Sequence, residues 1–319
     1  MGAADAVPGV SGGTIAFISG IYEELISTIS NVNFSLITTW KKEGFLAFWK
    51  QLNGNFIIAL LLGIIISFVS FMRLAKYLIE YHPVLIWSFF FGLIIASIYF
   101  VAKQIKKWEL STVVSLFLGA IIAYYISSMP LSTDSDSSLF LVFAGAIAIC
   151  AMILPGISGS FILLVLGAYK ALSDAVHDWD FKKLGLFVLG AVVGLLSFSR
   201  LLKWLFKHYH NLTLAVLTGF ILGSLNKVWP WKETMMVMNK DTGNLSELKE
   251  FSEFGTLSVY QKSIENFESL KTVSEQSISP WFYSEINGNI NPQILTSILL
   301  MLAGFLTIFI LEKIGNKTS

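Results

Sequence analysis

The chain has 319 residues, of which 55% are hydrophobic and 13% are charged, and its mean hydropathy is +0.69. A soluble domain of this length cannot bury so much apolar surface, so the composition excludes an ordinary soluble protein and indicates several membrane spans. The net charge of +1, without a basic tail, gives no indication of a nucleic-acid partner. The single cysteine excludes an intrachain disulfide, and neither it nor the four histidines have metal-ligand spacing, so we expect no cofactor.

A membrane span needs about 20 apolar residues, and six stretches of the chain approach or exceed that length. We predict spans at 55–79, 84–102, 110–128, 184–205, 212–229 and 293–312. Two further apolar regions, 1–29 and 138–172, are each interrupted by a Pro-Gly motif. The polar stretch 230–292 is too long for a connection, so we expect a small insertion outside the membrane.

The two interrupted regions carry nearly the same phrase. Residues 8–25 align without gaps on 155–172 with 8 of 18 identical, and residues 62–98 align on 189–225 with 12 of 37 identical. The second block pairs Gly63 with Gly190, Phe71 with Phe198, Arg73 with Arg200, Lys76 with Lys203, Gly92 with Gly219 and Ser97 with Ser224. Matches of Pro, Gly and Arg are more informative than matches of Leu or Ile in an apolar chain, so we infer an internal duplication.

Each half, 1–128 and 138–319, is predicted to contain a helical hairpin followed by three spans. The second motif lies between two apolar arms of about 15 residues, each of which reaches ~22 Å as a helix, short of the ~30 Å hydrocarbon core. Such arms favour a re-entrant hairpin that returns to its own side of the membrane. The alternative is one ordinary span followed by a long helix that is kinked at glycine. Only seven residues precede the first motif, so we expect the entering arm of hairpin 1–29 to be incomplete in this sequence.

Clusters of basic residues orient the two halves. They lie after the first hairpin, two spans later, at the end of the first span of the second half and near the C-terminus: Lys41, Lys42, Lys50, Lys103, Lys106, Lys107, Arg200, Lys203, Lys207, Lys313 and Lys317. The positive-inside rule places them, with the C-terminus, in the cytoplasm and places the insertion 230–292 outside the cell. Three spans is an odd number, so the halves have opposite orientations. The predicted fold is an all-α polytopic membrane protein with an inverted-topology repeat, a common plan of secondary transporters.

The repeated phrases predict a polar site inside the membrane. Irregular backbone at membrane depth is tolerated only when it is buried in protein or lines a wet cavity. Free N–H groups, hydroxyls and helix N-termini favour an anion such as phosphate. The candidate ligands are Ser11, Gly12, Gly13, Thr14, Ser158, Gly159 and Ser160, with hairpin turns at Pro8, Gly9, Pro155 and Gly156. The alternative is that these small residues only allow helices to pack closely.

Arg73 and Arg200 occupy equivalent positions of the two repeats. Arginine inside a bilayer costs at least ~2.5 kcal/mol unless it is paired or reaches the interface, so intramembrane arginine is a functional candidate. Its planar fork suits phosphate oxygens, and we predict that both arginines bind substrate. The alternative is that they only mark helix ends by snorkelling.

Three acidic residues adjoin the first phrase: Asp5, Glu23 and Glu24. They are possible sites for a coupling proton or cation. The alternative is that Glu23 and Glu24 mark the exit of the hairpin into water and that Asp5 caps a helix.

The phrases GAADAVPGVSGGTIAFISGIYEELI and LPGISGSFILLVLGAY resemble the paired signatures of the polyprenyl-phosphate transporter family, formerly a membrane family of unknown function. The resemblance covers almost the whole chain and includes the segment NKVWPW at 226–231. It implies a transporter, not an enzyme, that returns undecaprenyl phosphate across the bacterial cytoplasmic membrane for reuse in envelope synthesis. By alternating access the phosphate headgroup would occupy the polar site while the isoprenoid tail stays among the membrane lipids; no oligomeric state is implied.

Three other classes of protein compete with this expectation. A carrier or channel for a small anion would need the same arginines and hairpins but no lateral opening for a lipid tail. A membrane enzyme would need a nucleophile and base pair or an acidic metal cluster at membrane depth, and the sequence contains no such motif. A purely structural protein would not explain paired backbone breaks and paired arginines.

Overall fold

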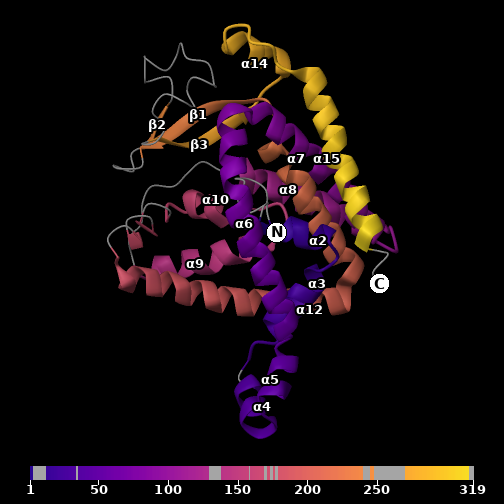
Figure 1. Ribbon diagram of the computed structural model, residues 1–319, viewed down its shortest axis with the longest axis vertical. Helices are drawn as coiled ribbons and strands as arrows, with labels where there is room; N and C mark the ends of the chain where they lie inside the picture. Colours follow the sequence, from indigo (N-terminus) through magenta and orange to yellow (C-terminus); the bar gives the residue numbers. More distant parts are fainter. Residues whose placement is uncertain are drawn as a thin grey trace.

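The computed structural model describes residues 1–2, 12–33, 35–128, 138–157, 159–168, 171–172, 175–176, 179–239, 245–247 and 270–315. Most of them are helical (Figure 1). The helices are α2 (Gly12–Ile18), α3 (Tyr22–Ser30), α4 (Ser35–Glu43), α5 (Phe45–Gln51), α6 (Gly54–Tyr81), α7 (Pro83–Lys103), α8 (Leu110–Ser128), α9 (Ser138–Ile153), α10 (Gly159–Val165), α12 (Phe181–Gly223), η1 (Ser224–Val228), α14 (Pro280–Ile286) and α15 (Ile294–Gly315).

The helices have the length and composition of a membrane protein. Among the described residues, three helical stretches are long and apolar enough to cross a membrane, and the bent pair α5–α6 makes a fourth: Pro83–Lys103, Leu110–Ser127, Phe181–Val228 and, across a 63° bend, Phe45–Gln51 with Gly54–Ser67. Large apolar side chains on four helices are more than half exposed: Ile65, Phe117, Val193 and Leu302. Exposed apolar surface of this extent is typical of contact with lipid, so the chain is a polytopic helical membrane protein.

Two predicted spans, 184–205 and 212–229, form one continuous element in the structure. The chain stays helical from α12 into η1 but bends at Tyr209, whose φ is −134° and ψ is 47°. Between α6 and α7, His82 has nearly the same backbone conformation, with φ −137° and ψ 51°. His82 and Tyr209 are matched positions in the sequence alignment, so the two repeats break their helices at the same place and in the same way.

The Gly-rich phrases also fold alike where both are described. Helices α2 and α10 cover matched residues, and each is followed by a matched glycine with positive φ: 75° at Gly20 and 74° at Gly167. The residue after each glycine donates its N–H to the carbonyl five positions earlier. Ile21 donates to Ala16 O at 3.1 Å, and Ala168 donates to Leu163 O at 2.9 Å. Such left-handed helix ends favour glycine because it has no Cβ.

Each repeat packs its second span against the third span of the other repeat. Helix α7 lies against α15, and the C-terminal part of α12 lies against α8. Matched glycines make both contacts, since a Cβ on Gly92 would overlap the carbonyl of Met301 and a Cβ on Gly219 would overlap that of Leu116. These close backbone approaches require glycine and join the two halves tightly.

Both of these helix pairs run parallel. In α7 and α15, Gly92 lies against Met301, and further along Phe100 and Phe309 have ring centroids 4.6 Å apart. In α8 and α12, Gly219 lies against Leu116, and Gly223, one turn further along α12, lies against Ala120, one turn further along α8.

The insertion contains β-structure that we did not predict. Strands β1 (Lys232–Asn239), β2 (Leu245–Glu247) and β3 (Leu270–Ser277) form an antiparallel sheet in the order β2-β1-β3, and α14 follows (Figure 1). Two tryptophans near its start bond to later parts of the insertion: Trp229 Nε1 donates to Ile278 O at 2.8 Å, and Trp231 Nε1 donates to Pro292 O at 2.9 Å. The all-α expectation therefore applies to the membrane part, and the insertion is an addition to it.

Candidate functional site: the contact between the two hairpins

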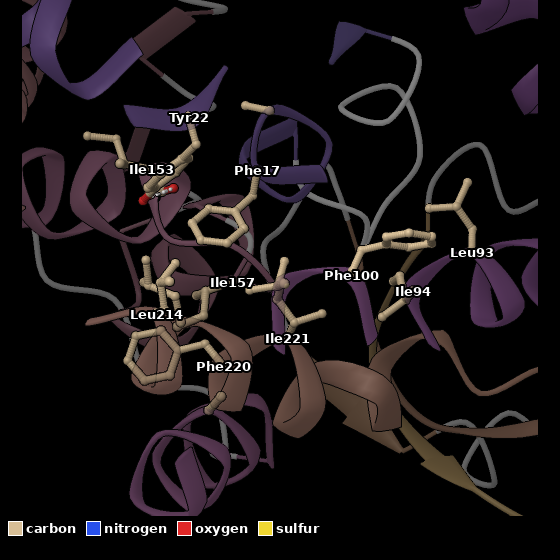
Figure 2. Packing of buried hydrophobic residues seen from close by; sticks show 14 of the residues in the cluster. Phe17, Tyr22, Leu93, Ile94, Phe100, Ile153, Ile157, Leu214, Phe220 and Ile221 are labelled. Carbon is tan, nitrogen blue, oxygen red and sulfur yellow. Dashed lines mark hydrogen bonds between the residues drawn. The ribbon is translucent and has the colours of Figure 1, made fainter. Parts of the chain in front are cut away.

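The two Gly-rich hairpins meet inside the protein. The Gly156 N–H of the second hairpin donates to Thr14 Oγ1 of the first at 2.9 Å, although 142 positions separate them in the sequence. The Tyr22 hydroxyl donates to Ile153 O at 3.2 Å, and the Thr14 and Tyr22 residues are 1% and 2% exposed. Figure 2 shows Phe17 and Tyr22 of the first hairpin in the same apolar cluster as Ile153 and Ile157 of the second. The contact is thus a small polar centre in an apolar core.

The backbone at Gly156 explains why the motif contains glycine there. Its φ is +85°, which L side chains rarely adopt. A Cβ at this position would also lie 2.7 Å from Ser224 Oγ and 2.8 Å from Phe220 O. Glycine therefore allows the turn to approach α12 and η1, where it lies close to the Ser224 hydroxyl.

The other predicted hairpin residues have varied positions. Gly12 and Gly13 are buried at the start of α2, Pro155 is buried in the turn, and Gly159 begins α10, where a Cβ would lie 2.9 Å from Ala148 O. Ser160 lies in α10. Five predicted residues lie outside the described part of the chain: Asp5, Pro8, Gly9, Ser11 and Ser158.

The two arginines lie on the matched helices α6 (Arg73) and α12 (Arg200). Arg200 Nη2 donates to Val32 O at 3.1 Å, and Lys203 Nζ donates to Asn31 Oδ1 at 3.0 Å. Both acceptors follow the C-terminus of α3, where the helix dipole favours cations. The first span of repeat 2 is therefore attached to the hairpin of repeat 1, and this bond of Arg200 is with a neutral carbonyl.

The acidic candidates lie at the start of α3 and have polar partners. Glu23 Oε1 lies 3.2 Å from His210 Nε2, one residue past the bend of α12. Glu24 Oε1 accepts a hydrogen bond from Asn53 Nδ2 at 2.9 Å. Both contacts are solvent-exposed. Within the described ranges, no group of three or more His, Cys, Asp or Glu residues could hold a metal ion.

We did not predict that Thr14 and Gly156 touch, because alignment shows that two segments are alike and not that they meet. The Tyr22 hydroxyl and the Ser224 hydroxyl were also missed as parts of the centre. For both residues a signal was present, since Tyr22 is matched by Tyr169 and Ser224 by Ser97 in the repeat alignment.

The exposed apolar helices define a polytopic helical membrane protein, and the two Gly-rich segments form a buried polar contact within it. The profile of the undecaprenyl phosphate translocase-like family matches residues 1–246, and the chain belongs to this family. It is 42% identical over 317 residues to a polyprenyl-phosphate transporter of Vibrio cholerae serotype O1, covering 99% of this chain and 94% of that protein. It is 32% identical over 259 residues to a polyprenyl-phosphate transporter of Staphylococcus aureus, covering 75% and 86%. No solved structure matches the chain significantly. The family expected from the sequence is confirmed.

Proposed function

We propose that this protein translocates undecaprenyl phosphate across the bacterial cytoplasmic membrane, so that the lipid carrier is reused in envelope synthesis, and that it performs no catalysis. The observation that carries the proposal is the Thr14–Gly156 bond, which joins one Gly-rich hairpin from each repeat in an apolar core. The names of the Vibrio and Staphylococcus relatives support the choice of a polyprenyl phosphate over other anions.

The hairpin contact suits a phosphate headgroup because its groups are N–H and hydroxyl donors. In this conformation the Gly156 N–H is bound to a neutral hydroxyl of Thr14. Hydrogen bonds to an ionised oxygen are roughly twice as strong as bonds between neutral groups. A phosphate that reaches the contact would replace the Thr14–Gly156 bond with stronger ones, so the two hairpins would separate around it.

Alternating access follows from opposed repeats. Consecutive spans cross a membrane in opposite directions, so spans two and three of one repeat are antiparallel. Because the second span of each repeat lies parallel to the third span of the other, the two repeats would run in opposite directions. One hairpin would then enter from each face, with the C-terminus in the cytoplasm and 230–292 outside, as the basic clusters predict.

The arginines would transfer the headgroup between the two faces. The guanidinium of Arg200 donates to the Val32 carbonyl, a neutral acceptor that a phosphate oxygen would displace. Arg73 has the matched position on α6 and would act at the other face. The isoprenoid tail would remain in the lipid along the exposed apolar flanks of the helices.

Replacing Arg200 or Arg73 singly by alanine should slow the return of undecaprenyl phosphate from the outer face about tenfold, the loss expected for a hydrogen bond to a charged group, so the surface-exposed pool in cells should rise. The matched control is Lys203→Ala, because Lys203 is attached to the same end of α3 as Arg200. This control should recycle the lipid within twofold of the wild type. Normal recycling by both arginine variants, at normal membrane abundance, would exclude the arginine mechanism.

A further inference from the structure

Ser97 and Ser224 are matched positions of the two repeats, the first inside α7 and the second directly after α12. Ser97 in α7 is 0% exposed, and Ser224, at the start of η1, is 2% exposed. Each hydroxyl donates back to its own helix, Ser97 Oγ to Leu93 O at 2.7 Å and Ser224 Oγ to Ile221 O at 2.8 Å. The two repeats therefore present a buried hydroxyl at the same place.

Ser224 belongs to the polar centre between the hairpins. Its Oγ lies 2.7 Å from the position that a Cβ of Gly156 would occupy. The N–H of the same glycine donates to Thr14 Oγ1. Gly156 thus contacts the first hairpin through its N–H, which donates to Thr14, and closely approaches the Ser224 hydroxyl of η1.

We propose that Ser224 is a headgroup-binding residue and that Ser97, its match in the repeat alignment, has the same role in the other repeat. The inference rests on the proposed function and adds two ligands to its site. A serine hydroxyl rotates freely, so its proton can leave the Ile221 carbonyl and turn to a phosphate oxygen. The ligand class is the phosphate monoester of an isoprenoid alcohol.

Ser88 provides the structural alternative within the same protein. It is 0% exposed, and its Oγ donates to Val84 O at 2.7 Å, the back-bonded geometry that Ser and Thr adopt inside helices. The matched position of repeat 2 is Ala215, so this hydroxyl occurs in only one repeat. Ser88 is therefore a matched control for burial and bonding that lacks the repeated placement.

The test is equilibrium binding of three probes to the purified full chain: farnesyl phosphate, farnesol and inorganic phosphate. Ser224→Ala and Ser97→Ala should each raise the Kd for farnesyl phosphate about tenfold, because each removes a hydrogen bond to a charged oxygen. The Kd for farnesol should not change, since farnesol lacks the phosphate. Inorganic phosphate should compete with farnesyl phosphate for the wild type, which separates the headgroup contribution from that of the tail. Ser88→Ala should bind all probes within twofold of the wild type.

The outcomes distinguish the inference from the proposed function. If the wild type binds farnesyl phosphate and Ser224→Ala binds it equally well, Ser224 is not a ligand and the proposed function stands. If Ser88→Ala loses as much affinity as the other two variants, the hydroxyls are structural and the inference is overturned. If the wild type does not bind farnesyl phosphate, the proposed function itself is contradicted. Should Ser224→Ala fail to fold, Ser224→Cys keeps the volume with a weak donor and should show the same loss.

Discussion

Replacing Gly190 by alanine is expected to destabilise the protein strongly, whereas the same replacement at its repeat mate Gly63 is expected to be harmless. A Cβ on Gly190 would overlap the carbonyl oxygen of Val142, so α9 and α12 would have to move apart. Overpacking of this kind costs about 1–3 kcal/mol, and backbone atoms relax less than side chains. No atom lies within 4 Å of a Cβ on Gly63, and alanine favours the helix by up to ~1 kcal/mol over glycine.

The thermal unfolding midpoints of the purified variants would measure this difference. We expect a fall of several degrees and a lower folded yield for Gly190→Ala, and an unchanged or raised midpoint for Gly63→Ala. Equal shifts in the two variants would show that α9 does not pack against Gly190 as described.

Replacing Thr14 by valine is expected to impair both stability and transport. Valine keeps the branched shape but cannot accept the hydrogen bond, so the Gly156 N–H loses the partner it has at 2.9 Å. A buried donor left without a partner costs about 1–3 kcal/mol. The same change removes a hydroxyl from the proposed headgroup site, so lipid recycling should fall even in protein that remains folded.

Thr218→Val is the matched control for Thr14→Val. Thr218 is 0% exposed, and its Oγ1 donates to Leu214 O at 2.6 Å within its own helix. Without the Thr218 hydroxyl no buried donor loses its partner, because the hydroxyl is itself the donor and the Leu214 carbonyl lies within a helix. We therefore expect a smaller loss of stability than for Thr14→Val, and normal lipid recycling. Thr14→Ser retains the hydroxyl and should restore most of the transport. A Thr14→Val variant with wild-type stability and transport would show that the Thr14–Gly156 contact is needed for neither.

The long spans could be predicted from the sequence because apolar length decides them. The range predicted for α8, 110–128, agrees with the structure, and those for α6 and α7 differ from it by one or two residues at each end. The helical bend at Tyr209 lies within 206–211, the break predicted between the spans 184–205 and 212–229, although no proline marks it. The repeat alignment also indicates this bend, because Tyr209 is matched by His82 and a proline, Pro83, follows His82.

For the candidate site, the sequence indicated the turn residues but not the contact between the two hairpins. The motif predicted the turns at Pro155 and Gly156, because only a few residues suit such backbone. The approach of Thr14 to Gly156 depends on how α2, α9 and α12 pack, and a single sequence carries no information about that contact. The strands of the insertion were missed because short, polar strands such as β2 resemble loops in composition.

The central claim is tested most directly with purified protein in sealed vesicles that contain undecaprenyl phosphate in both leaflets. A phosphatase that cannot cross the membrane is added outside, and the fraction of lipid that it hydrolyses is measured. We predict that nearly the whole pool is hydrolysed in vesicles with the wild-type protein and about half in empty vesicles. In vesicles with Arg200→Ala, the inner half should be hydrolysed about tenfold more slowly than with the wild type. Hydrolysis of only the outer half of the pool with the wild-type protein would contradict the proposal that this chain translocates the lipid.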